Sequence, residues 1–281
     1  MAELDKQINL NAFSLVFHIR SLNSNTVLPP FTGHLVRGFV LRLIKEVNPD
    51  ISDILHQGNN IRPYSVSTIY NPNGHLPRMS QGALNLNPSH SVAFRFSTIN
   101  QDINQALVQG ILSLSNTPIT LANKSFLLET VSFESNHFSE HNLIPHSFPT
   151  SFSVQFLTPT QFSRMMSSQA YLFPDPMILF GNLMNLAQSL NIFNVDVDSE
   201  DFIQYISRSV HPINYQLKTR KISTGKVISM VGFTGWARYR ITDLNDSNVS
   251  FLPILLKLGS FLHVGNKRTA GFGEIRYSDF V

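Results

Sequence analysis

The stretch that decides the fold is LPILLKLGSFLHVGNKRTAGFGEIRY, residues 252–277. Residues 252–261 are almost all apolar, which predicts a helix that lies in a core. Three glycines, Gly265, Gly271 and Gly273, follow within ten residues and indicate a loop, since glycine accepts backbone conformations that other residues avoid. Residues 272–277 then read as a strand. A helix, a glycine-rich loop and a strand form the end of a larger α+β unit.

The residues before this stretch supply the rest of the unit. Residues 151–157 alternate as a strand, and Pro176 begins a helix that continues to about residue 190. Two strands are predicted over residues 212–218 and 226–241. The order is βαββαβ, which is typical of ferredoxin-like units.

The first half of the chain has the same order. A strand over 13–20 is followed by a helix with apolar residues between 35 and 47, and Asn48-Pro49 ends it. Strands are predicted over 64–70 and 91–99, then a helix that Asp102 can cap, and a strand over 124–134. We therefore predict an α+β fold of two tandem ferredoxin-like (βαββαβ, RRM-like) domains, residues 1–140 and 148–281.

Composition excludes several classes of protein. The 281 residues contain no cysteine, so disulfides, thiolate zinc sites, iron–sulfur clusters and a cysteine nucleophile are excluded. No run approaches the roughly 20 apolar residues that cross a bilayer, and MAELDKQINL lacks the layout of a signal peptide. We expect a cytoplasmic protein that does not contact a membrane.

Charge is informative through its position. The net charge is only +3. From Phe202 to Thr242, however, there is no Asp or Glu, while that segment carries these cations: Arg208, Lys218, Arg220, Lys221, Lys226, Arg238 and Arg240. Clustered cations without nearby acids attract phosphates, so the segment predicts a face that binds a polyanion. The alternative is a sparsely charged strand region whose basic tips are merely solvated.

The glycine-rich segment 264–273 resembles the glycine-rich loop of the RAMP superfamily of CRISPR-associated proteins. Within that superfamily the chain resembles the repeat-processing endoribonucleases, which cut precursor CRISPR RNA inside each repeat. Three further stretches agree in order and spacing: LHQGNNIRPYSVS (55–67), FLTPT (156–160) and VGFTGWARY (231–239). The resemblance spans nearly the whole chain.

The resemblance implies a reaction without metal or other cofactor. The ribose 2′-OH attacks the adjacent phosphate, and the products are a 2′,3′-cyclic phosphate and a 5′-OH. His56 matches the catalytic histidine of the family, and histidine suits either proton-transfer role. Arg62 matches a nearby cation, usually lysine, that stabilises charge on the phosphate. Taken alone, a histidine after a helix is more often structural.

A third catalytic position departs from the family. Some members carry a tyrosine on the first helix, and the matching residue here is Leu41, which cannot transfer a proton. His34 lies two helical turns earlier on nearly the same face and could replace that group, assisted by Arg37. The alternative is that His34 only helps to begin the helix after Gly33.

The resemblance also implies an RNA-binding surface in the second domain. Lys267 and Arg268 are predicted at the crest of the glycine-rich loop, and Gly265, Gly271 and Gly273 are predicted to expose N–H donors. Arg238, Lys218, Arg220, Lys221 and Lys226 are predicted to hold RNA. The alternative for the loop is simple chain reversal. The family has a glycine where this chain has His263, which either alters the turn or lies near the RNA.

Other functions and partners remain open at this point. The missing tyrosine favours a RAMP subunit that binds guide RNA in a CRISPR effector complex without cutting it. A third reading is a structural ferredoxin-like protein unrelated to RNA. Some relatives pair, so a homodimer is a further possible partner. We find no convincing metal site, and Asp196 and Asp198 read as an exposed acidic turn.

Overall fold

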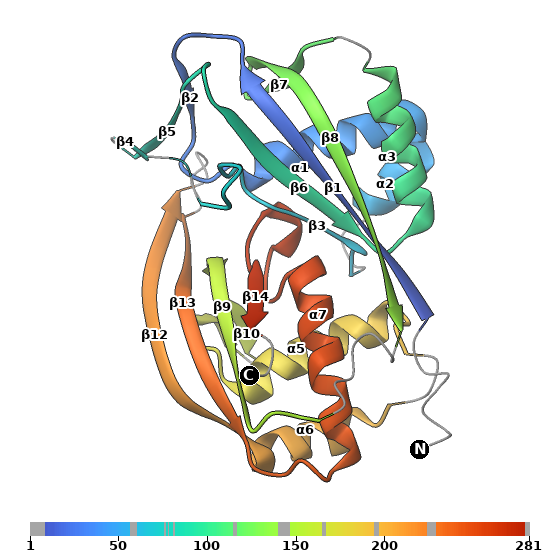
Figure 1. The fold of residues 1–281 in the computed structure, drawn as a ribbon, viewed down its shortest axis with the longest axis vertical. Coiled ribbons are helices and arrows are strands. Elements are labelled where there is room, and N and C mark those ends of the chain that lie inside the picture. The colour runs from blue at the N-terminus through green and yellow to red at the C-terminus, as the bar shows by residue number, and fades with distance from the viewer. Residues whose placement is uncertain are drawn as a thin grey trace.

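The structure is a computed structural model that describes residues 9–56, 61–75, 77, 79–80, 82–114, 117–139, 147–164, 167–193, 197–223 and 229–278. Two domains lie one above the other along the long axis (Figure 1). Each has its own sheet, its own helices and its own hydrophobic core. We placed the junction near residues 138–150, and residues 140–146 of it lie outside the described part of the chain.

The first domain has a five-stranded antiparallel sheet in the order β3-β6-β1-β8-β7. Its strands are β1 (Asn9–Ser21), β3 (Tyr64–Val66), β6 (Ser91–Thr98), β7 (Ile119–Leu121) and β8 (Lys124–Ser139). The helices are α1 (Gly33–Val47), α2 (Pro49–His56) and α3 (Gln101–Ser113). Leu15, Phe17 and Ile19 alternate along β1 and are buried with apolar residues of α1 and α3, so these helices cover one face.

Two local features of this domain differ from the sequence prediction. Asn100, not Asp102, caps α3, because its Oδ1 accepts from the Ile103 N–H at 2.9 Å. A small three-stranded sheet of β2 (Thr26–Leu28), β5 (Ala83–Leu86) and β4 (Met79–Ser80), in that order, was not predicted. Its strands have at most four residues, which is too short for a clear alternation.

The second domain has a four-stranded antiparallel sheet in the order β12-β13-β9-β14. Its strands are β9 (Ser151–Thr160), β12 (Val210–Ser223), β13 (Ser229–Ile241) and β14 (Ile275–Ser278), beside a short hairpin of β10 (Phe162–Arg164) and β11 (Ser167–Tyr171). The helices are α5 (Pro176–Ser189), α6 (Ser199–Ser209) and α7 (Phe251–Leu262), with short 3₁₀ turns η1 (Ser247–Ser250) and η2 (Arg268–Ala270). In both domains the second, third, first and fourth strands of the βαββαβ order are neighbours, as in a ferredoxin-like sheet. The predicted fold class is confirmed.

Helix α6 corrects one sequence prediction. We read Asp198 as part of an acidic turn, but its carboxylate caps α6 by accepting from the Glu200 and Asp201 N–H groups. Phe202, Tyr205 and Ile206, at helical spacing, bury the inner face of this helix. Asp196 lies outside the described residues.

The two domains meet at the glycine-rich loop. Gly271 packs on Gly33 at the start of α1, and a Cβ on Gly33 would lie 2.1 Å from the Ala270 carbonyl oxygen. The rings of Phe31 and Phe272 lie 4.2 Å apart between centroids and bury Met230 from the β12–β13 hairpin. This hairpin rises along the side of the second domain toward the first (Figure 1). The loop therefore joins α1, the hairpin and α7 in one place.

Candidate nucleic-acid interface and catalytic groove

A groove of about 380 Å³ lies between α1 and α2. Residues one helical turn apart on α1 line it: His34, Gly38, Leu41 and Lys45, with Arg37 and Arg42 beside them. Ser52 of α2 and Leu41 are buried and form the floor. His34 is half-buried, so the structure places it in the wall of the groove with Arg37 and Leu41, as the helical spacing predicted.

His56 and Arg62 lie at the end of α2. His56 is its last residue, four residues after Ser52. Its side chain lies outside the described residues. Arg62 Nε donates to the Leu55 carbonyl oxygen at 2.8 Å, which brings the guanidinium to the carboxyl end of this helix. Arg62 therefore contacts the end of α2 that His56 closes, and the same helix contributes Ser52 to the groove.

The three glycines of the loop do not expose N–H donors, which corrects the sequence prediction. The N–H of Gly265 donates to Asn182 Oδ1 at 2.8 Å, that of Gly271 to the Arg268 carbonyl, and that of Gly273 to the Pro159 carbonyl. All three have positive φ, and a Cβ on Gly273 would lie 1.8 Å from the Val264 carbonyl oxygen. Glycine is needed here because the loop folds tightly against protein backbone.

Arg268 also differs from its prediction. Its guanidinium donates to the carbonyl oxygens of Tyr64 at 3.0 Å, of Leu262 at 3.3 Å and of Arg62. Burial lowers its pKa to about 10, so it stays charged near neutrality. We predicted a phosphate contact at the loop crest, but this side chain turns inward and links the two domains.

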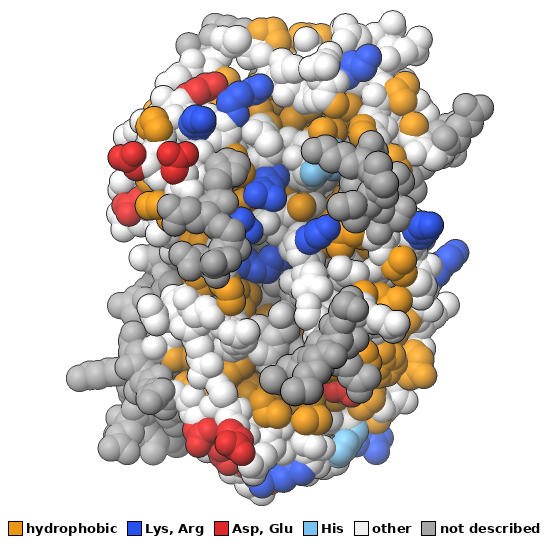
Figure 2. All heavy atoms as spheres, turned by 180° about the vertical axis from the view of Figure 1, so that it is seen from behind, with side chains coloured by type: hydrophobic (Ala, Val, Ile, Leu, Met, Phe, Trp, Pro, Cys, Tyr) orange, Lys and Arg blue, Asp and Glu red, His pale blue; other side chains and the backbone are white. Residues whose placement is uncertain are grey.

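Lys267 is exposed, as predicted for the loop crest. Its backbone is left-handed, with φ of 56°, and begins the turn that points Arg268 inward. On the face shown in Figure 2, Lys and Arg side chains gather across the middle, and Asp and Glu lie toward the periphery. The band of positive charge therefore crosses the region where the domains meet.

His263 is fully buried and does not lie near a surface that RNA could reach. Its φ of 63° and ψ of 174° belong to a backbone region that is almost restricted to glycine. Nδ1 lies 3.2 Å from the Phe272 carbonyl oxygen. Burial, followed by the charge of Arg95, holds the pKa of His263 well below 6.5. We left open whether His263 alters the turn or lies near the RNA, and the structure supports the altered turn.

Alanine usually gives a more stable protein than glycine, and we expect the reverse at residue 263. Both His263→Gly and His263→Ala remove the buried ring, but only glycine relieves the backbone. The glycine variant should be more stable than the alanine variant by about 1–2 kcal/mol, measured by denaturant unfolding. Equal stabilities would mean that the backbone strain is absent.

The pH dependence of stability should also reflect the burial of His263. The native ring is neutral, whereas in the unfolded chain it protonates near its ordinary pKa of 6.5. The unfolded state therefore binds more protons below pH 6.5, and the free energy of unfolding should fall as the pH is lowered through that value. His263→Gly should flatten this part of the profile, measured between pH 5 and 8 at about one-unit steps.

The cations of the second domain divide between two faces of its sheet. Lys218 and Arg220 are exposed on β12, and their cross-strand partners are Thr234 and Gly232. Arg238 of β13 is exposed and lies on the same face, opposite Asn214. Helices α5 and α7 cover the other face. Lys221 alternates to the opposite face from Arg220, and Lys226 lies outside the described residues.

The sequence did not indicate Arg276 as a site residue, whereas Trp236, Tyr239 and Phe272 were considered as stacking partners for unpaired bases. Arg276 of β14 and Trp236 of β13 both lie opposite Gln155 of the central strand β9, so their side chains project to the same side. Strand register would have found Arg276, but the register is not readable from the sequence. Tyr239 and Phe272 are buried, so of the aromatic residues near the hairpin it is the half-buried Trp236 that reaches this face.

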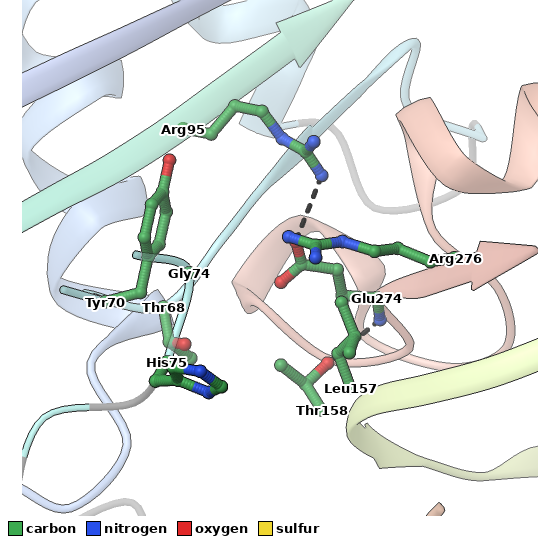
Figure 3. Close-up of a pocket in the computed structure, with 9 residues that line it drawn as sticks. All are labelled: Thr68, Tyr70, Gly74, His75, Arg95, Leu157, Thr158, Glu274 and Arg276. Carbon is green, nitrogen blue, oxygen red and sulfur yellow. Dashed lines mark hydrogen bonds and ion pairs between the residues drawn. The ribbon is translucent and has the colours of Figure 1, made fainter. Parts of the chain in front are cut away.

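A cleft of about 230 Å³ between the domains adjoins this face. Thr68, Tyr70 and His75 line it from the first domain, and Thr158, Glu274 and Arg276 from the second (Figure 3). Arg95 Nη2 lies 3.1 Å from Glu274 Oε1, an ion pair that bridges the cleft. The side chains are 26% and 12% exposed, so water screens this pair less than a surface pair.

The described residues contain no group of three or more His, Cys, Asp or Glu side chains placed to hold a metal ion. Within the same residues, no helix is long and apolar enough to span a membrane.

Two family models match the chain. The Cas6 N-terminal domain matches residues 13–136, and the CRISPR-associated endoribonuclease Cas6 matches residues 154–275. The chain belongs to the Cas6 family. The two matched regions correspond to the two ferredoxin-like domains and together include α1, α2, the β12–β13 hairpin and the glycine-rich loop. No curated protein sequence matches the chain significantly.

Solved Cas6 structures share the fold over nearly the whole chain. A product complex of Thermus thermophilus Cas6 (TTHB231) has a TM-score of 0.75 at 19% identity and covers 95% of this chain and 99% of its own. A product complex of another Cas6 (TTHA0078) has a TM-score of 0.70 at 17% identity, with 96% and 100% covered. A Cas6-related protein from Pyrococcus furiosus has a TM-score of 0.61 at 13% identity, with 95% and 99% covered. At these identities the likeness establishes the fold.

Proposed function

We propose that this chain is a metal-independent endoribonuclease that binds CRISPR repeat RNA and cleaves precursor crRNA within the repeat. Membership of the Cas6 family supports the endoribonuclease activity. Solved relatives were described as product and substrate-mimic complexes, which supports repeat RNA as the ligand. The observation that carries the proposal for this chain is that His34 lines the α1–α2 groove with Ser52 of α2, while Arg62 binds the carboxyl end of the same helix, next to His56.

The reaction needs two proton transfers and one cation. A base takes the proton of the ribose 2′-OH, whose oxygen forms a bond to phosphorus, and the bond from phosphorus to the 5′-oxygen breaks. An acid protonates the leaving 5′-oxygen, so no water is consumed and the products are a 2′,3′-cyclic phosphate and a 5′-OH. We assign one proton transfer to His56 and the other to His34, with Arg62 beside the phosphate oxygens.

RNA outside the groove would be held by exposed cations of the second domain. Lys267 of the loop and Lys218, Arg220 and Arg238 of the open sheet face are exposed and can reach phosphates. Lys221, on the other side of the β12–β13 hairpin, and Lys226 are also assigned to RNA binding in this proposal. Arg268 and the three glycines are assigned instead to holding the loop in place.

The reaction class is tested with labelled repeat RNA in excess EDTA. We expect cleavage to continue, and the 5′ fragment to end in a 2′,3′-cyclic phosphate. RNA with a single 2′-deoxy nucleotide at the cleavage site should bind but remain intact, because the nucleophile is missing. Loss of cleavage in EDTA, or cleavage of the 2′-deoxy RNA, would contradict the mechanism.

Leu41 favours a second candidate function. It is 5% exposed in the floor of the groove, where some family members place a tyrosine. A chain without that proton donor could serve as a RAMP subunit that holds guide RNA in a CRISPR effector complex. Tight RNA binding with no product, and no dependence of binding on His56, would decide for this alternative.

A further inference from the structure

The floor of the α1–α2 groove contains a buried hydroxyl that the fold does not use. Ser52 is 0% exposed, and within the part of the chain that the structure describes its Oγ has no hydrogen-bond partner. Ser52 lines the groove together with the apolar Leu41. A buried polar atom without a partner is costly, so a ligand whose entry uncovers this hydroxyl gains a hydrogen bond that the free protein does not make.

Gly38 keeps the groove open. It lies in the middle of α1, where glycine is a poor helix former, and it is exposed. A Cβ built on it would have no neighbour within 4 Å, so no close approach of protein atoms requires glycine here. The space above it is the groove itself. The sequence therefore accepts a weaker helix at the place where any side chain would enter the groove.

The charges around the groove indicate what it holds. Four of its lining residues are His34, Arg37, Arg42 and Lys45, and none of the lining residues is acidic. Glu46 lies next to this rim, 4.0 Å from Arg42 Nε, and both side chains are more than half exposed, so the pair is weak. An apolar floor with one hydroxyl, under a cationic rim, matches a flat nucleobase whose flanking phosphates remain at the surface.

We propose that this groove is a nucleobase subsite that takes one unstacked base next to the cleaved phosphate. One face of the base contacts Gly38 and Leu41 on the same side of α1, and its polar edge bonds to Ser52 Oγ once the base uncovers that hydroxyl. The neighbouring phosphates contact Arg37 and Lys45. In this arrangement Leu41 has a binding role where some family members have a tyrosine. The inference rests on the proposed function, because it places the base beside the proposed catalytic residues.

The groove is tested with Gly38→Leu, which fills it. Leucine is a better helix former than glycine, so the variant should unfold at or above the wild-type temperature. Its single-turnover cleavage of repeat RNA should nevertheless fall about tenfold or more, because the base is displaced. Gln109→Leu on the exposed side of α3 is the matched control and should cleave like the wild type.

Abasic substitutions locate the base. Among repeat RNAs that each lack one base near the cleavage site, the wild type should show one position with a loss of about tenfold, and Gly38→Leu should be insensitive at that position. Ser52→Ala should lower the preference for the natural base there by about fivefold, with no loss of stability. Normal cleavage by Gly38→Leu, or equal sensitivity of both proteins at every position, would overturn the subsite.

The failure of this inference can be told apart from failure of the proposed function. If wild-type protein cleaves and Gly38→Leu cleaves equally well, only the subsite is wrong. If wild-type protein does not cleave at all, the endoribonuclease assignment is wrong, and the same variants are compared by their affinity for uncut RNA with and without the abasic position. Affinity that Gly38→Leu leaves unchanged on the intact RNA then rejects the subsite as well.

Discussion

His56→Ala is expected to lower the single-turnover cleavage rate of repeat RNA by about 100- to 10,000-fold, because it removes one of two proton transfers. Affinity for RNA that carries a 2′-deoxy nucleotide at the cleavage site should change little. The rate is measured with labelled RNA at saturating protein, so that binding does not limit it. His90→Ala, at an exposed turn before β6, is the matched control and should cleave normally.

Two further observations would assign the role of His56 more sharply. Added imidazole should restore part of the activity of His56→Ala, since a small base can enter the space left by the ring. The double variant of His56 and His34 should lose little more than His56→Ala alone, because residues that act as one unit are not additive. Unchanged cleavage by His56→Ala would remove His56 from the mechanism.

Arg268→Ala and Lys267→Ala should separate stability from RNA binding at two adjacent residues. Arg268→Ala removes the donors to three backbone carbonyls, which belong to Tyr64, Leu262 and Arg62. We expect the free energy of unfolding to fall by about 3 kcal/mol, since hydrogen bonds to a charged group are strong and the carbonyls lose their partner. Cleavage should fall with it, because Arg62 is then less well held.

Lys267→Ala should instead weaken RNA binding and leave stability unchanged. Its side chain is exposed, so the unfolding transition should not move, whereas RNA affinity should fall several-fold. The slope of the logarithm of affinity against the logarithm of salt concentration should decrease by about one, as for one lost phosphate contact. A stable Arg268→Ala protein with a reduced salt slope would reverse the two assignments.

Periodicity was sufficient to predict the fold. The helix over 252–261 and the glycine-rich loop occur where the sequence placed them, the final strand begins three residues later than predicted, and both sheets have the ferredoxin-like order. Helix α6 was missed because Asp198 was read by its charge alone, although a carboxylate before an apolar i, i+3, i+4 pattern is a capping signal. Residues 202, 205 and 206 carried that pattern.

The candidate site was harder to predict than the fold, because it depends on the directions in which individual side chains point. Lys267 and Arg268 look alike as neighbours, but a left-handed residue turns one outward and the next inward, and no composition rule predicts that turn. Arg220 and Lys221 are also adjacent cations, yet they point to opposite faces because side chains alternate along a strand. Ser52 belongs to no sequence motif, and its place in the groove is evident only from the packing of α2 beside α1.

The contact between Arg268 and the first domain has a consequence for protein synthesis. Arg268 binds the carbonyl oxygens of Tyr64 and Arg62, which precede it in the chain by 204 and 206 residues. A ribosome makes the first domain, with His34 and His56, long before it makes the loop that fixes Arg62 and the start of α1. The nascent first domain should therefore emerge with the residues of the α1–α2 groove but without the contacts that hold the backbone at Arg62 and Tyr64, so that full activity of the proposed nuclease would await synthesis of the loop.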